Sequence, residues 1–217
     1  MFGDNNLSFE INILMANQMW HDEWVDWDFN THECVPGRQC LHFTQQVWKD
    51  TRRVCYGAAK VGRRTYVVAR YQPRGNFIIR DHNGQTTSWD DNVRPSNEVV
   101  TSKPTNPTTR STNRPSTKTS RPVTTPRPVQ GGSEQSCQST ISSVADRSAI
   151  CTAISDANRK RVIHHAPPME VDLTLCQHAQ SYAQHLAQKN NGLNHDSNLL
   201  NRLQEGNFYI SLNRCVG

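Results

Sequence analysis

A long low-complexity segment divides this chain of 217 residues and limits what either side of it can fold into. Thr, Ser, Pro and Arg predominate in residues 96–135. Such a composition cannot bury an apolar core, so we expect a disordered linker, either a plain tether or an O-glycosylated one. An apolar fraction of 35% fits a partly disordered chain. Folded structure must therefore come from residues 1–95 and 136–217.

The positive charge of the chain belongs to this linker. The formal net charge is +5, and the stretch from 99 to 133 contains no acidic residue. Its six basic residues are Lys103, Arg110, Arg114, Lys118, Arg121 and Arg127. Removing them leaves about −1 for the remainder, so we expect no nucleic-acid interface on the folded parts.

The first folded segment contains a predicted β-hairpin. Val54–Lys60 and Thr65–Tyr71 are rich in residues that favour extended backbone, and Gly62 lies between them. Residues 66–69 are apolar without alternation, which predicts a strand that is buried on both faces.

Two motifs lie at this hairpin: one precedes it, and the other contains most of its second strand and the residues that follow. The first is His42-Phe43-Thr44-Gln45 with Val47-Trp48, and the second runs from Tyr66 to Asn76. In this order and spacing they resemble the two signatures of the CAP superfamily (cysteine-rich secretory proteins, antigen 5 and pathogenesis-related 1 proteins), although Leu41 stands where the family has Gly. The second signature contains Arg70, Tyr71, Pro73, Gly75 and Asn76, and Ala69-Arg70-Tyr71 is similar to Golgi-associated pathogenesis-related members.

The residues before the first signature also resemble this family. Gly3-Asp4-Asn5 is similar to its Gly-Glu-Asn motif, with Asp in place of Glu. A helix is predicted from about Ile11 to Asp26, and Trp20-His21-Asp22-Glu23 resembles the family's Trp-Tyr-x-Glu helix. We expect its apolar positions to pack on a sheet: Leu14, Met15, Met19, Val25, Trp20, Trp24 and Trp27.

The second segment resembles the opening of the same family. One amphipathic helix is predicted through Ile141, Val144, Ile150 and Ile154, and a second begins at an Asp172 N-cap and stops at Gly192. The motifs that carry the resemblance are Asn158 with Arg161, His165 with Pro167-Pro168, Leu193-Asn194-His195, and Glu205-Gly206-Asn207, in which the family's first two residues are exchanged.

The two segments thus resemble parts of a CAP domain in permuted order. Residues 1–95 resemble the back part and residues 136–217 the front part, and the implied fold is α+β, a three-layer α-β-α sandwich with a mostly antiparallel sheet. We favour two partial domains from a tandem-CAP protein. The alternative is one permuted domain, since a linker of about 40 residues spans roughly 35 Å and such a domain is roughly 30–40 Å across. Exchange of half-domains between two chains is also open.

Cysteine content suggests an extracellular protein. Seven cysteines are present, and Cys34 and Cys40 flank a Pro-Gly turn that would let them close a short disulfide loop. For Cys151 and Cys176, buried free thiols are an equal alternative. No signal peptide and no apolar run of membrane-spanning length is visible, which taken literally indicates a cytosolic chain. Because the resemblance implies a truncated, secreted protein, we expect instead that a signal peptide was lost by truncation.

The resemblance implies a cleft lined by two histidines and two acidic residues. Carried over by position, these are Glu23, His42, His195 and either Glu205 or Asp4, and they would suit zinc or another divalent cation. The simpler alternatives are a hydrogen-bonded buried His42, a loop His195 and a solvated Glu23. The other histidines fit exposed positions: His21, His32, His82, His164, His165, His178 and His185.

Three functions remain open on the sequence. The resemblance implies a secreted, non-enzymatic binding module for a sterol, a lipid or a protein, with peripheral membrane contact. A metal-assisted hydrolase or protease is the second, although no Gly-x-Ser-x-Gly or His-Glu-x-x-His motif is present and we assign no catalytic residue. The third is a non-functional fragment.

Overall fold

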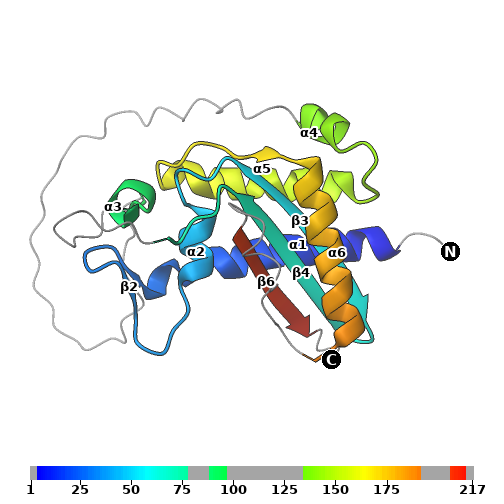
Figure 1. Cartoon of the computed structure of the whole chain (residues 1–217), viewed down its shortest axis with the longest axis horizontal. Helices are drawn as coiled ribbons and strands as arrows, with labels where there is room; N and C mark the ends of the chain where they lie inside the picture. The colour runs from blue at the N-terminus through cyan, green and yellow to red at the C-terminus, as the bar shows by residue number, and fades with distance from the viewer. Residues whose placement is uncertain (1–3, 78–87, 97–133, 192–205, 214–217) are drawn as a thin grey trace, which may run out of the picture.

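The computed structural model describes residues 4–77, 88–96, 134–191 and 206–213, with the backbone alone for residues 4–8 and 206–213. Most of the predicted linker lies outside these ranges. The helical elements are α1 (Asp4–Asp22), the 3₁₀ turn η1 (Glu23–Asp26), α2 (Leu41–Gln46), α3 (Ser88–Asn92), α4 (Glu134–Thr140), α5 (Arg147–Ile163) and α6 (Leu173–Lys189). The strands are β1 (Trp27–Asp28), β2 (Glu33–Cys34), β3 (Arg53–Val61), β4 (Arg64–Gln72), β5 (Glu170–Val171) and β6 (Gly206–Asn213) (Figure 1).

The main sheet is built from both segments of the chain. Its strand order is β5-β3-β4-β6, so the β3–β4 hairpin of the first segment lies between two strands of the second. β4 pairs antiparallel with β3 and β6, whereas β5 pairs parallel with β3. The structure thus differs from the favoured interpretation of two separate partial domains. The hairpin alone would have two unpaired edges, and the second segment supplies the strands that cover them.

Helices cover both faces of this sheet. Tyr66 and Val68 pack against α6, while Val67, Ala69 and Tyr71 pack against α1 and α5 on the opposite face (Figure 1). Successive strand residues point to opposite faces, which explains why an unbroken apolar run is needed here. The predicted hairpin, its burial on both faces and the α+β class are confirmed.

The α1 helix buries only part of the predicted apolar set: Trp20 is in the core and Leu14 packs against it, but Met15 and Met19 do not. Ile13, Ala16 and Trp20 lie in the core, whereas Met15 and Met19 are 49% and 44% exposed. Val25 is also exposed, because the helix gives way to η1 after Asp22. Apolar residues occur nearly all round this helix, so periodicity alone could not select the buried face.

The second segment begins with two helices where one was predicted. α4 ends at Thr140 and α5 starts at Arg147, and the buried Ile141 lies between them. α6 starts as predicted, with Asp172 Oδ1 accepting a hydrogen bond from the Leu175 backbone N–H at 3.0 Å. Its predicted stop at Gly192 is wrong: the helix ends at Lys189, and Asn190 adopts the left-handed conformation with φ of 46°.

Three disulfides connect the described elements. Cys34–Cys40 is present as predicted. Cys151 bonds to Cys137 and Cys176 bonds to Cys55, so neither is the free thiol considered from the sequence. Cys55–Cys176 joins β3 to α6 across 121 positions of sequence. Closure of so long a loop stabilises a fold by about 4–5 kcal/mol in the chain-entropy account.

Arg161 ties α5 to the first segment. Its fully buried guanidinium donates to the carbonyl oxygens of Gln46, Trp48 and Thr51 at 2.8–2.9 Å, and its Nε donates to that of Pro167 at 2.8 Å. Burial lowers the pKa of Arg161 to about 9, so the side chain stays protonated at neutral pH. The carbonyl groups of Gln46, Trp48 and Thr51 belong to the end of α2 and the chain that follows it, which Arg161 therefore holds in place.

None of the helices in the described ranges combines the length and apolar character that crossing a membrane requires.

Replacement of Arg161 by Met is expected to lower the free energy of unfolding by at least about 3 kcal/mol, because each buried carbonyl left without a donor costs roughly 1–3 kcal/mol. Urea denaturation followed by circular dichroism measures this loss. Arg159→Met on the same helix is the control, since that side chain is 69% exposed and its removal should change stability by less than about 0.5 kcal/mol. Equal effects of the two substitutions would contradict the role of Arg161.

Candidate functional site

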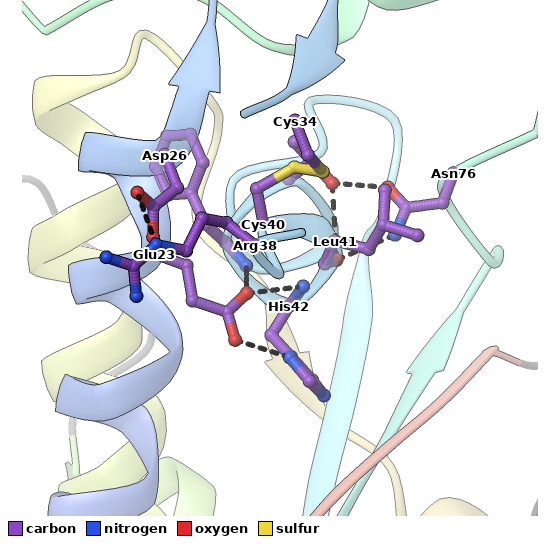
Figure 2. The surroundings of a disulfide bond; sticks show 10 residues. Glu23, Asp26, Cys34, Arg38, Cys40, Leu41, His42 and Asn76 are labelled. Atoms are coloured by element: carbon purple, nitrogen blue, oxygen red, sulfur yellow. Dashed lines mark hydrogen bonds and ion pairs between the residues drawn. A yellow bond between two sulfur atoms is a disulfide. The ribbon is translucent and has the colours of Figure 1, made fainter. Parts of the chain in front are cut away.

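A carboxylate and an imidazole form the centre of the candidate site. The Nδ1 atom of His42 lies 2.6 Å from Oε1 of Glu23 (Figure 2). The side chains are 22% and 17% exposed, so the pair is largely but not fully removed from water. The structure therefore brings together two of the residues that the sequence assigned to one cleft, although 19 positions separate them.

Glu23 also holds the backbone at the start of α2. Its Oε2 accepts hydrogen bonds from the backbone N–H groups of His42 at 3.0 Å and Phe43 at 3.3 Å. The first N–H groups of a helix have no partner within the helix, and the N-cap residue Cys40 makes no side-chain hydrogen bond here. Glu23 thus supplies the missing acceptor from a neighbouring element, and one carboxylate orients both the backbone and the ring of His42.

The hydrogen bond constrains the tautomer of His42. A carboxylate in its ionised form can only accept, so Nδ1 carries the proton that it accepts, and in the neutral imidazole Nε2 is the acceptor atom. Trp20 stacks on the imidazole, with ring centroids 5.9 Å apart and planes inclined by 14°. The ring is therefore restrained by its acceptor and by an aromatic face.

The other residues of the first signature attach α2 to the chain after β4. Gln45 Oε1 accepts from the Gly75 backbone N–H at 2.6 Å, and Thr44 Oγ1 donates to Asn76 Oδ1 at 2.8 Å. Asn76 Nδ2 donates in turn to the Leu41 carbonyl at 2.7 Å. These contacts give the polar signature residues a structural role in positioning His42.

Gly75 is required by close packing at this attachment. A Cβ atom on Gly75 would lie 2.6 Å from Cγ of Trp48, inside any allowed contact distance. Phe43, Trp48, Arg70 and Tyr71 are all buried. Burial of these residues shows that the signatures contribute to the packed interior as well as to the site.

The Cys34–Cys40 disulfide lies next to the start of α2, the helix that carries His42. Cys34 lies on β2, and Cys40 directly precedes α2. Val35 donates its backbone N–H to the Asp26 carbonyl at 2.8 Å, which places the disulfide loop beside η1 and hence beside Glu23 (Figure 2).

Three of the predicted ligands lie beyond what the structure describes. His195 and Glu205 fall outside the described residues, and Asp4 begins α1 but its side chain is not among those described. Within the described part of the chain, no three His, Cys, Asp or Glu side chains group closely enough to hold a metal ion. The four-residue ligand set therefore stays a prediction, and the Glu23–His42 pair is the part with observed geometry.

Two histidines that were expected to be exposed lie close to the site. His164 is 3% exposed, and its ring packs edge-on against Phe43 at 5.0 Å between centroids. His21 on α1 lies 5.5 Å from the His164 ring. Sequence periodicity did not reveal them, because α1 and the end of α5 come together only in the folded chain.

His21 is held in its neutral form. Burial, with the nearby His164 and Lys160, lowers the pKa of His21 from 6.5 to about 4. The ring Nε2 is buried without a hydrogen-bond partner, which fits an uncharged ring. At neutral pH the junction between α1 and α5 therefore carries no charge from this side chain.

Acidification is expected to destabilise the protein through His21. Its pKa is lower in the folded than in the unfolded chain, so the unfolded chain binds more protons and stability falls as pH decreases from about 6.5 towards 4. The variant His21→Gln removes this titration. Urea midpoints measured from pH 7 to pH 4 should decline less in the variant than in the wild type, and parallel curves would contradict the assignment.

Comparison with known proteins finds partial relatives. Pathogenesis-related protein 1A1 of Solanum lycopersicum is 36% identical over 72 residues, which cover 32% of this chain and 40% of that protein. A pathogenesis-related protein of PR-1 type from Sambucus nigra is 34% identical over 82 residues, 35% of this chain and 48% of that protein. Pathogenesis-related protein PRMS of Zea mays is 31% identical over 84 residues, 35% of this chain and 49% of that protein.

The chain thus spans less than half the length of these curated relatives. No protein-family model matches the chain, and no solved structure matches it.

Proposed function

Because the chain is related to the pathogenesis-related 1 proteins of the CAP superfamily, we propose that it is a secreted, non-enzymatic binding module whose cleft is organised by Glu23 and His42. The observation that carries this proposal is the carboxylate of Glu23, which binds both the ring and the backbone of His42. The layered helices and sheet support the family's three-layer sandwich as the fold. Three disulfides suit an extracellular, oxidising environment.

A divalent cation such as zinc fits the Glu23–His42 pair on chemical grounds. A histidine that ligates a metal commonly donates its other ring N–H to a carboxylate, which is the arrangement at Nδ1 of His42. His42 would then ligate through Nε2, and Glu23 would orient it. We propose His195, with Glu205 or Asp4, as the further ligands. A bound cation would supply positive charge for an anionic or carbonyl group of a ligand.

An apolar ligand, such as a sterol or a lipid, is the second candidate. Val25, Val35 and Leu41 are 62%, 45% and 47% exposed, and all three lie on the elements that carry Glu23, His42 and the Cys34–Cys40 loop. Exposed apolar side chains beside a polar pair suit a ligand with an apolar body and a polar end. The same residues would allow peripheral contact with a membrane.

Zinc binding tests the proposal directly. Titration calorimetry of the full chain with Zn²⁺ is expected to show saturable binding that His42→Ala removes. Glu23→Gln should weaken it by roughly 10–100-fold, because the amide can no longer orient the ring as a full acceptor. His185→Ala is the matched control: it removes a histidine from α6, outside the pair, and should leave zinc affinity unchanged.

Two results would count against this function. Equal zinc affinity in the wild type and His42→Ala would show that zinc does not bind at this site. Zinc-dependent turnover of a broad peptide pool that is lost in His42→Ala would favour the metal-assisted hydrolase. Saturable binding of a sterol without turnover would favour the apolar ligand.

A further inference from the structure

The two segments of the chain recognise each other through an extensive surface. α6 packs on β3 and β4, and α5 packs on α1, so the core between sheet and helices contains side chains from both segments. Gly57 lies so close to α6 that a Cβ atom there would stand 2.4 Å from the backbone at Ala179 and Gln180. Packing of this closeness depends on shape complementarity across the surface.

Polar contacts across the same surface are specific. The side-chain amide of Gln180 accepts from the Ala58 N–H at 3.1 Å and donates to the Ala58 carbonyl at 3.0 Å, so it takes the place of a neighbouring strand at the edge of β3. Asn17 donates to the Ala153 carbonyl at 2.8 Å. Together with the contacts of Arg161, these bonds define one relative placement of the two segments.

Neither segment is complete without the other. Without residues 134–213, the hairpin loses β5 and β6 and both covering helices of the second segment. Without residues 4–77, α5 and α6 lose the sheet that separates them. Nothing in these contacts requires that both segments belong to the same molecule.

We propose that the surface that residues 4–77 present to residues 134–191 also accepts this segment from a second copy of the chain, which gives an exchanged dimer with two complete folds. In that dimer, Arg161 and His164 of one copy would support His42 of the other. A linker of this length does not prevent closure within one molecule. Such tethering gives an effective concentration on the order of millimolar, so exchange should increase as protein concentration approaches that range.

The Cys55–Cys176 disulfide gives a selective test. One copy carries Cys55→Ser and the other Cys176→Ser, each with a different affinity tag, and both carry Cys215→Ser to remove the seventh cysteine. The two copies are unfolded, mixed and refolded in an oxidising glutathione buffer. A closed chain of either kind cannot form the bond. An exchanged dimer forms one bond between Cys55 of one copy and Cys176 of the other.

The expected result is a covalent dimer on a non-reducing gel that carries both tags, with the Cys55–Cys176 linkage identified by peptide mass spectrometry. Its yield should rise with protein concentration between roughly 10 μM and 1 mM. Absence of this linkage at all concentrations would overturn the proposal.

The Cys137–Cys151 disulfide provides the matched control. Both cysteines lie in the same segment, on α4 and α5. Both control copies therefore carry Cys55→Ser, Cys176→Ser and Cys215→Ser, and one adds Cys137→Ser while the other adds Cys151→Ser, so that exchange cannot join them through either native disulfide. An equal yield of covalent dimer in this control would show non-specific oxidation and would also overturn the proposal.

A second measurement applies if the Cys55→Ser or Cys176→Ser variant fails to fold, which circular dichroism would reveal. Two differently tagged copies that carry only Cys215→Ser are refolded together. Exchange predicts dimers with both tags that survive denaturant without reductant and separate with it, and their absence contradicts exchange. Because no metal or ligand enters these assays, failure of the proposed function would leave their outcome unchanged.

Discussion

The buried guanidinium of Arg161 is the interaction on which the rest of the structure depends. It comes from the second segment and binds three carbonyl oxygens of the first, at the end of α2 and in the loop from α2 to β3. A buried cation is costly unless every donor has a partner, so this geometry tolerates little displacement. Since α2 carries His42, the placement of α5 in one segment determines the placement of the candidate site in the other.

The site also depends on how one carboxylate is shared. Glu23 accepts from a ring and from two backbone N–H groups, so ring orientation and helix start are set by the same atoms. Residues of the two signatures then connect α2 to the end of β4 through Thr44, Gln45, Gly75 and Asn76. These polar signature residues thus connect α2 to the chain after β4, and in doing so they position the imidazole of His42.

Local features of the fold could be predicted from the sequence, and the pairing of the segments could not. The hairpin followed from β-branched and aromatic runs around Gly62, and the Asp172 cap followed from its position before an apolar stripe. The buried face of α1 could not be chosen, because apolar residues surround it. Glu23 and His42 were brought together only by family resemblance. The burial of His21 and His164 depends on a contact between α1 and α5, which no local pattern encodes.

The distribution of tryptophan gives the folded chain two separate optical reporters. All five indoles lie in the first 95 residues. Trp27, Trp48 and Trp89 form one aromatic cluster, with ring centroids 4.9 Å and 5.1 Å apart along the series, and this cluster is built from the first segment alone. Trp20 instead lies in the core shared with α5. Emission from the cluster therefore reports mainly on the packing of the first segment, whereas emission from Trp20 reports more directly on the docking of α5.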